Sequence, residues 1–366
     1  MEPIMMIFCL LFFIIFCLRK LVFQKREACC YMMAYECYEA PEDRKLDTDT
    51  CARIVLGNKN LGLQEHKFLL KTIVSSGIGE ETYGPRNVIS GQEDSPTLKD
   101  SISELDDLIF DTLDKLFAKT GISPSEIDIL VVNVSLFSPA PSLTARVVNR
   151  YKMRSNVKPF NLSGMGCSAS IVAIDLVQHL FKSYKNAFAI VVSTESLGSN
   201  WYQDRKIHDA LKLPLPFRRL LNALHKQQCF KTSSYLQIEA CRAYASWLKR
   251  RGLRICCIQV ADDLGYKGFL LAKSLKISAA KVLRVLLPKI LPLSEQFRYV
   301  YVSRQQNKTK RNSFQEMGAG LNLKTGVDHL CVHPGGRAII DEAGKGVSVQ
   351  HETCPWPTEA QKPVVS

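Results

Sequence analysis

The sequence predicts an α/β fold preceded by a membrane helix, and three observations point to it. Near-continuous apolar strands at 127–134 and 187–193 alternate with amphipathic helical patterns at 96–120 and 167–182, as in βαβ units. An uninterrupted apolar run over residues 4–18 predicts the membrane helix. With 366 residues, 46% of them hydrophobic, the chain suits roughly two or three globular domains, so disorder is excluded as its overall state.

The apolar run is followed by four cations between positions 19 and 26, and one anion, Glu2, precedes it. Extended to Phe23, the run can span a bilayer as a tilted helix, because long cationic side chains reach the interface. A cleaved signal peptide is disfavoured by the missing positive start, and a buried core helix is the other alternative. We therefore expect residues 1–26 to be an uncleaved anchor, with the body of the protein in the cytosol.

The first strong element of the body is a helix over residues 96–120, which Gly121 ends. Residues 27–95 before it mix short polar and apolar stretches with glycine and proline turn signals, so we expect a loop-rich covering segment there. The strand at 127–134 is apolar at nearly every position, which is typical of a strand covered on both faces. The apolar face of the helix is expected at Leu98, Ile102, Leu105, Ile109, Leu113 and Leu116.

A second helix and strand complete this α/β pattern. A helix over 142–151 is followed by an extended stretch to Phe160 and a glycine-containing turn at 161–166. A helix over 167–182 then leads to the strand at 187–193. Its apolar side is expected at Ile171, Ile174, Leu176 and Leu180.

Positive charge is concentrated in one stretch of the chain. The formal net charge is +13, and residues 205–254 hold twelve Lys and Arg against two acidic residues. A solvated helical face is the plain interpretation, although a basic balance also suits anionic partners such as acidic lipid or a phosphorylated small molecule. Nucleic-acid binding is not expected, because no recognition motif is present and the aromatic residues are not interleaved with the cations.

The cysteines favour a reducing compartment. There are 13 of them, without the regular spacing of a small secreted framework, and no two form a CxxC pair. We therefore expect no zinc ribbon and no other metal site.

Cys167 is the candidate nucleophile. It follows the turn Gly164-Met-Gly166 and stands where a helix begins, so its sulfur is expected at the positive end of the helix dipole. That position lowers a thiol pKa and favours the nucleophilic thiolate. The alternative is that Cys167 is a small buried apolar residue and that the glycines only permit close packing.

His333 is the candidate partner of the cysteine. It ends a short apolar stretch and precedes Pro334-Gly-Gly, which holds it on a constrained turn. An imidazole held there could donate a hydrogen bond to a carbonyl oxygen. A single histidine in a turn can also be purely structural, so the Cys/His combination remains suggestive at this point.

Several long segments have the pattern of one plant enzyme family. They are ILVVNVSLFSPAPSLTARVVNRYKMRSNVKPFNLSGMGCSA, VVSTE with NWY, CYEAPEDRKL, SGIGEETYGP, LPLSEQ and HLCVHPGGRAIIDE. Together they closely resemble the plant 3-ketoacyl-CoA synthases, the condensing enzymes of microsomal fatty-acid elongation. The resemblance covers most of residues 29–202 and 266–342.

The resemblance implies a thiolase-like layered α/β/α/β/α fold in two similar halves. Residues 27–202 would be the N-terminal half with the nucleophile, and 266–366 an incomplete C-terminal half with the catalytic histidine. Residues 203–265 would be a divergent basic segment between them. By resemblance, Cys167 matches the acyl-accepting cysteine, His333 the catalytic histidine, and His329 a second, supporting histidine.

The implied reaction is a decarboxylating condensation. A long-chain acyl-CoA and malonyl-CoA would give 3-oxoacyl-CoA, carbon dioxide and CoA, without a metal or redox cofactor. The family further implies a homodimer, partnership with the reductases and dehydratase of an elongase complex, and location in the endoplasmic reticulum membrane.

Two departures from the family pattern keep an alternative open. The glycine-rich core segment expected after Tyr202 is replaced by the basic stretch, and no asparagine follows Asn322, where the family has its catalytic Gly-Asn-(Ser/Thr)-Ser motif. Losing one donor to a developing enolate typically costs about 10²–10³ in rate, so we expect little condensation from the chain as written. The alternative function is a non-catalytic, membrane-anchored relative that binds elongase subunits or acyl-CoA.

Overall fold

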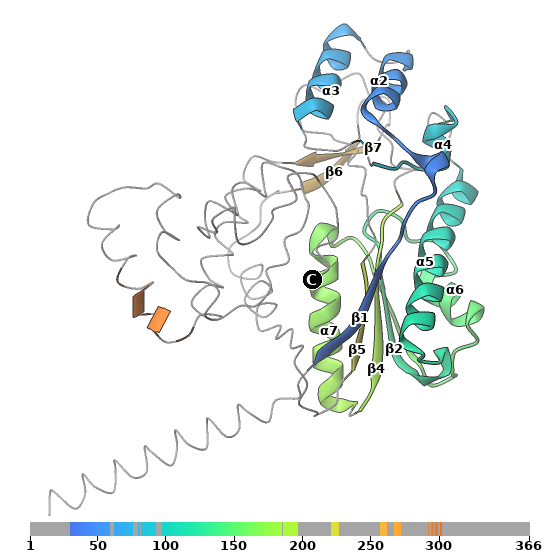
Figure 1. Ribbon diagram of the computed structural model, residues 1–366, viewed down its shortest axis with the longest axis vertical. Coiled ribbons are helices and arrows are strands. Elements are labelled where there is room, and N and C mark those ends of the chain that lie inside the picture. The colour runs from blue at the N-terminus through green and yellow to red at the C-terminus, as the bar shows by residue number, and fades with distance from the viewer. Residues whose placement is uncertain are drawn as a thin grey trace, which may run out of the picture.

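The main sheet of the described residues is five-stranded, in the strand order β1-β5-β4-β2-β3, and it is packed between helices (Figure 1). The computed structural model describes residues 30–58, 62–75, 80, 82–92, 97–184, 186–196, 221–226, 257–261 and 267–271, with a few positions between 292 and 301. The sheet strands are β1 (Tyr31–Cys37), β2 (Ile127–Asn133), β3 (Lys158–Leu162), β4 (Phe188–Ser193) and β5 (Leu221–Lys226). A separate antiparallel pair consists of β6 (Cys257–Ala261) and β7 (Lys267–Leu271).

The predicted α/β pattern is confirmed in this sheet. β2 pairs in parallel with β3 and β4, whereas β5 is antiparallel to β4 and β1. The parallel strands are connected through helices, as βαβ units require. The helices are α2 (Thr48–Gly57), α3 (Leu63–Ser75), α4 (Arg86–Ile89), α5 (Leu98–Thr120), α6 (Leu143–Arg150) and α7 (Ala169–Ser183), with short 3-10 turns η1 (Glu42–Arg44), η2 (Pro124–Glu126) and η3 (Gly166–Ser168).

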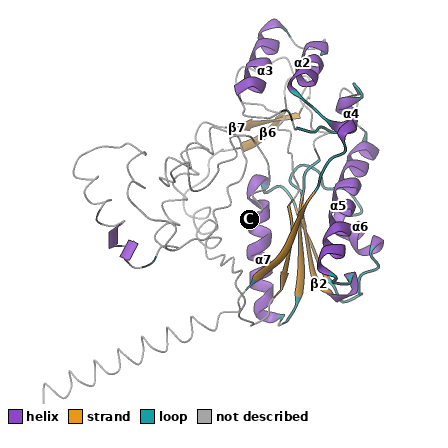
Figure 2. Ribbon diagram, in the orientation of Figure 1, coloured by secondary structure: helices purple, strands orange, loops and turns teal. Residues whose placement is uncertain are grey.

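Helices cover both faces of the sheet, with α5 and α6 on one side and α7 on the other (Figure 2). Because side chains alternate along a strand, β2 and β4 each divide their apolar residues between the two layers. Both layers are buried, and burying one large apolar side chain stabilises the fold by about 1.5–3 kcal/mol. This explains why these strands are apolar at nearly every position. Leu130, Val132, Ile190 and Val192 face α5 and α6, while Ile129, Val131, Ala189 and Val191 face α7.

The sequence predicted α5 closely because both of its ends carry local signals. Thr97 and Asp100 form a reciprocal capping box at the start. Gly121 adopts a left-handed conformation with φ 67° at the end, and its N–H donates to the Phe117 carbonyl at 2.9 Å. The expected apolar face is correct from Leu105 to Leu116, but Leu98 is exposed because it begins the helix beyond the edge of the core.

The buried face of α7 differs from the expectation. Its fully buried positions recur every four residues, and two of them are alanines that let the helix lie close to β2 and β4. Leu176 and Leu180 pack at the margin of this layer, whereas Ile171 is exposed. The buried positions are Ala169, Ala173, Val177 and Phe181.

The expectation of a loop-rich segment over residues 27–95 is wrong in part. It contains the strand β1 and the helices α2 and α3. β1 was missed because a strand is stabilised by its neighbour, and β1 pairs with β5, which is almost two hundred positions later in the chain. α2 begins at Asp47, whose carboxylate accepts the Thr50 N–H at 2.8 Å.

Within the basic stretch 205–254, the structure describes Leu221–Lys226, and these residues form a strand rather than the expected helical face. β5 lies between β1 and β4 and pairs with both. The hydrogen-bonding edges of those two strands supply partners for the β5 backbone, a non-local effect that charge patterning along the sequence cannot show.

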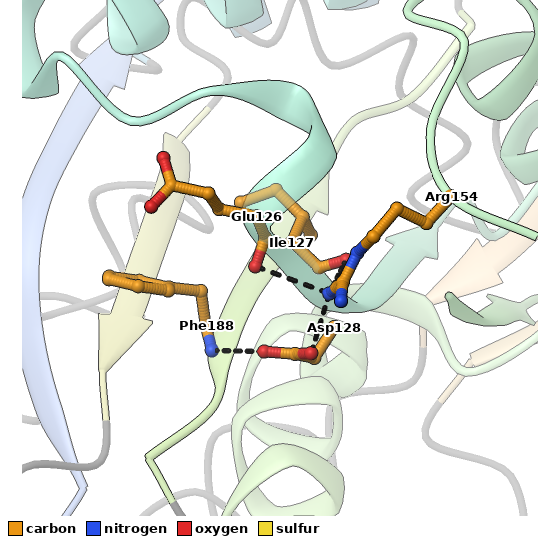
Figure 3. A network of polar contacts seen from close by, with 5 residues as sticks. All are labelled: Glu126, Ile127, Asp128, Arg154 and Phe188. Carbon is orange, nitrogen blue, oxygen red and sulfur yellow. Dashed lines mark hydrogen bonds and ion pairs between the residues drawn. The ribbon is translucent and has the colours of Figure 1, made fainter. Parts of the chain in front are cut away.

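At the amino ends of β2 and β4, the carboxylate of Asp128 joins the two strands (Figure 3). One oxygen accepts the Phe188 N–H at 2.9 Å, and the other binds the Arg154 guanidinium at 2.6 Å. Arg154, which lies between α6 and β3, also donates to the carbonyl of Ile127 at 3.2 Å. The Asp128–Phe188 hydrogen bond lies where the β2–β4 register shifts between Ile127 and Ile129, so Asp128 accepts from a backbone N–H at that irregularity.

Candidate active site

The carboxyl ends of the three parallel strands lie side by side. Asn133, the last residue of β2, is in register with Leu162 of β3 and with Ser193 of β4. Its side-chain amide donates to the Ser193 hydroxyl at 2.8 Å, although Asn133 itself is buried. In open α/β sheets, ligands bind just beyond this edge, so the loops that follow these strands are the candidate site.

The backbone around Cys167 has the predicted strand–turn–helix geometry. β3 ends at Leu162, and η3 carries Cys167 directly into α7. Gly164 and Gly166 have φ values of 71° and 58°, which favour glycine strongly. A Cβ at either glycine would meet nothing within 4 Å, so backbone conformation rather than crowding explains the two glycines.

The first turn of α7 leaves its backbone donors without a side-chain cap. Ser168 is the N-cap residue, and its hydroxyl donates to the Met165 carbonyl at 2.8 Å instead of accepting from the helix. Uncapped N–H groups concentrate the positive end of the helix dipole. The Cys167 backbone lies at this end of α7, although the position of its sulfur is outside the described part of the structure.

Ser135 connects the loop after β2 to the glycine turn. Its hydroxyl donates to the carbonyl of Gly166 at 3.1 Å, and its carbonyl accepts the N–H of Gly164 at 3.2 Å. These two hydrogen bonds hold the turn on both sides of Met165. The conformation of the residues before Cys167 therefore depends on a loop from a different strand.

Glu195 connects that same loop to the end of β4. One carboxylate oxygen accepts the Ser135 N–H and the other accepts the Leu136 N–H, each at 2.9 Å. Burial raises the pKa of Glu195 to about 7; hydrogen bonds from Leu136, Ser135 and Ser196 oppose the shift, and the nearby charge of Glu104 adds to it. Ser196 also donates from its hydroxyl to Glu104 of α5 at 2.9 Å.

Sequence reasoning missed the roles of Ser135 and Glu195. Both lie within motifs that carried the family resemblance, but neither motif assigned them a contact. A usable signal was the position of polar residues directly after two apolar parallel strands, because the carboxyl ends of such strands meet at one edge. Their partnership still joins positions 60 residues apart, which local patterning does not predict.

Several predicted features lie outside the described residues. These are the anchor at 1–26, both candidate histidines His333 and His329, and the basic segment 203–265 apart from β5 and β6. No helix in the described ranges combines the length and apolar character needed to cross a membrane. Across the same ranges, no three His, Cys, Asp or Glu side chains are grouped so as to hold a metal ion.

Comparison with known protein families gives a match over most of the chain. Residues 22–308 match the family described as FAE1/Type III polyketide synthase-like protein. The chain is 51% identical over 350 residues to 3-ketoacyl-CoA synthase 19 of Arabidopsis thaliana, covering 92% of this chain and 74% of that protein. It is 41% identical over 362 residues to 3-ketoacyl-CoA synthase 12 of the same plant, covering 93% and 74%.

Solved structures share the fold at low sequence identity. PKS-I from the brown alga Ectocarpus siliculosus superposes with a TM-score of 0.64 at 16% identity, over 89% of this chain and 83% of that one. The 1,3,6,8-tetrahydroxynaphthalene synthase of Streptomyces coelicolor A3(2), a bacterial type III polyketide synthase, gives a TM-score of 0.58 at 14% identity, covering 90% and 84%. These likenesses support the expected thiolase-like α/β fold.

Proposed function

The chain belongs to the FAE1/type III polyketide synthase-like family as a 3-ketoacyl-CoA synthase of very-long-chain fatty-acid elongation, and on this premise we propose that Cys167 is its acyl-accepting nucleophile. The observation that carries the proposal is the backbone of the glycine turn. It brings Cys167 to the uncapped start of α7, at the carboxyl ends of β2, β3 and β4. A thiolate is stabilised by such a helix end.

The first half of the proposed reaction is acyl transfer. The Cys167 thiolate attacks the carbonyl of a long-chain acyl-CoA, a carbon–sulfur bond forms, and CoA leaves as a thiolate that takes up a proton. The acyl group then remains on the protein as a thioester. The helix dipole favours the thiolate before attack, so it lowers the barrier for this step.

The second half is the condensation itself. Malonyl-CoA loses carbon dioxide, and the resulting enolate attacks the acyl thioester carbon, which releases 3-oxoacyl-CoA and restores the Cys167 thiolate. We assign His333 as a hydrogen-bond donor to the developing enolate and His329 as its supporting neighbour. The support for both assignments is their place in HLCVHPGG, and preorganised donors are usually the largest contribution to such a step.

We extend the proposal to membrane attachment through residues 4–23, with the body in the cytosol at the endoplasmic reticulum. The support is the apolar run and the cations that follow it. Alkaline carbonate extraction of microsomes should leave the protein in the pellet, and recovery in the soluble fraction would contradict the anchor. A homodimer and association with the elongase reductases and dehydratase belong to the same proposal.

The decisive experiment separates the two half-reactions of the full chain in detergent. Intact-mass analysis after incubation with a long-chain acyl-CoA should show one acyl adduct, which Cys167→Ala removes. Addition of malonyl-CoA tests the condensation step: any 3-oxoacyl-CoA that forms from the adduct should be lost in His333→Ala, while the adduct itself remains. An adduct on another residue would overturn the assignment of Cys167, and an adduct without product would favour a non-condensing relative.

Thiol reactivity tests the nucleophile without substrate. Burial raises the pKa of Cys51 to about 11, so that thiol is almost fully protonated at neutral pH, and Cys30 is buried. A limiting alkylating agent at neutral pH should therefore label Cys167 before the other twelve cysteines. Peptide mapping gives the order, and uniform labelling would contradict an activated thiol.

A further inference from the structure

We propose that Glu195 is a positioning residue for Cys167, which it holds in place through Ser135. The inference rests on the proposed function of Cys167 and adds a residue at the end of β4 to its site. Glu195 binds the backbone of the loop after β2, and that loop binds the glycine turn before the nucleophile. Cys167 thus takes its backbone position from three strands together.

The first link is between Glu195 and the loop after β2. The two carboxylate oxygens take one N–H each, from Ser135 and from Leu136, both at 2.9 Å. The preceding residue, Val134, still donates to the Leu162 carbonyl at 3.0 Å, so Ser135 and Leu136 are the first two donors beyond the ladder with β3. Glu195 therefore fixes the loop at the point where sheet hydrogen bonding stops.

The second link is between Ser135 and the glycine turn. The Ser135 hydroxyl donates to the Gly166 carbonyl at 3.1 Å, and the Ser135 carbonyl accepts the Gly164 N–H at 3.2 Å. The Gly166 carbonyl is part of the peptide group that joins Gly166 to Cys167. A movement of Ser135 would therefore rotate the peptide that leads directly into the nucleophile.

The charge environment of Glu195 is unsuited to a purely stabilising role. Among the residues that the structure describes, the charged group acting on Glu195 is Glu104, an anion on α5 that Ser196 reaches by a hydrogen bond. Desolvation and the charge of Glu104 both disfavour the ionised form of Glu195, and groups perturbed in this way are concentrated at functional sites. Protonation would turn one acceptor oxygen into a hydroxyl and weaken one of the two backbone hydrogen bonds.

The test measures the alkylation rate of Cys167 by iodoacetamide in the full chain in detergent, from about pH 5.5 to about 9, with peptide mapping. The native chain should show one inflection from the thiol and another near the pKa of Glu195, which is about 7. Glu195→Gln should slow the reaction about tenfold at neutral pH and abolish the second inflection, because the amide offers only one acceptor oxygen. Glu195→Asp should keep the inflection with an intermediate rate.

Ser135→Ala tests the second link, because it removes the hydroxyl and keeps the backbone N–H that Glu195 binds. It should slow alkylation roughly three- to fivefold. Combined with Glu195→Gln, the loss should be clearly less than the product of the two single losses, since both act through one chain of contacts. Fully multiplicative losses would overturn the proposed path.

Asp128→Asn is the matched control, because it changes a carboxylate that binds a backbone N–H between the same two strands at their other end. It should leave the rate and pH profile of Cys167 unchanged. Equal slowing by Asp128→Asn, or a folded Glu195→Gln variant with the native profile, would overturn the proposal. If Glu195→Gln does not fold, the alkylation rates and pH profiles of Glu195→Asp and Ser135→Ala test the proposal in its place.

Acylation of the native chain by acyl-CoA is measured in a separate assay, so that a failure of the proposed function can be told from a failure of the positioning role. An unacylated native chain would reject the catalytic assignment of Cys167, whereas the alkylation profile would still report whether Glu195 controls that thiol. Normal acylation with an unchanged Glu195→Gln profile would reject only the positioning role.

Discussion

The two ends of the strand pair β2–β4 are both held by a carboxylate that accepts backbone N–H groups, but in different electrostatic surroundings. At the amino end, Asp128 accepts the Phe188 N–H and is paired with Arg154 at 2.6 Å. At the carboxyl end, Glu195 accepts two N–H groups, its described charged neighbour is the anion Glu104, and its pKa is raised to about 7.

The two carboxylates therefore differ in charge environment along one pair of strands. An ion pair with a guanidinium favours the charged form of a carboxylate, which can accept hydrogen bonds on both oxygens. With a pKa of about 7, Glu195 lies close to its titration midpoint at neutral pH, and its hydrogen bonds change with its charge. The carboxylate whose charged form is disfavoured therefore lies at the carboxyl ends of the strands, on the side of Cys167, and the ion-paired carboxylate lies at their amino ends.

The largest expected effect is on stability, from Phe181→Ala in α7. Phe181 is fully buried against β2 and β4, and α7 runs from Cys167 towards the amino end of β4. Removing the ring should lower the free energy of unfolding by about 3–5 kcal/mol, measured by denaturant unfolding. In the folded fraction, Cys167 should be alkylated at the native rate. A slower rate would show that loss of core packing under α7 also changes the reactivity of Cys167.

A pH effect of somewhat smaller size is expected from Glu195. Its pKa is raised from 4.5 in the unfolded chain to about 7 in the folded one, so the folded state binds the proton more tightly. Its contribution to stability is therefore full below pH 4.5 and is lost as the pH rises to about 7, by about 3 kcal/mol.

Other carboxyl groups titrate in the opposite direction, because hydrogen bonds lower the pKa values of Asp47, Glu80 and Asp100. The measurement is therefore the difference in free energy of unfolding between the native chain and Glu195→Gln at several pH values. A difference that stays flat between about pH 4.5 and 7 would show that folding does not raise the pKa of Glu195.

Arg154→Ala should have a moderate effect at the amino end. The guanidinium binds Asp128 at 2.6 Å and the Ile127 carbonyl at 3.2 Å, and both partners are about one third exposed or less. We expect a loss of about 1–2 kcal/mol in the free energy of unfolding, decreasing at high salt. Thiol reactivity at Cys167 should not change, and a changed pH profile would mean that the two ends are coupled.

The smallest effects come from a matched pair of glycines. Gly166 has φ 58° beside Cys167, and Gly121 has φ 67° at the end of α5, before the amino end of β2. An alanine at either position should cost about 1 kcal/mol, since both positions have room for a Cβ and differ from ordinary backbone only in φ. Only Gly166→Ala should slow alkylation of Cys167, and equal slowing by Gly121→Ala would contradict the local role of the turn.

The predictable parts of the fold and site are those with local causes. The bounds of α5 follow from Thr97, Asp100 and Gly121, which are all at or near its ends. The turn that leads into Cys167 follows from two glycines and the helix after them. Leu98 and Ile171 were misassigned to buried faces because helical periodicity defines an apolar stripe but not where the sheet lies beneath it.

The sequence by itself determined the βαβ pattern, the membership of the synthase family and the place of Cys167 at the start of a helix, because strand burial, capping and glycine turns act over a few residues. Tertiary structure alone decided that β5 lies between β1 and β4, and that Glu195 meets Ser135 across 60 positions. Those contacts depend on which strand edges come together when the sheet forms. Such pairing is stabilised by backbone groups common to every residue, so it leaves little trace in the side-chain pattern.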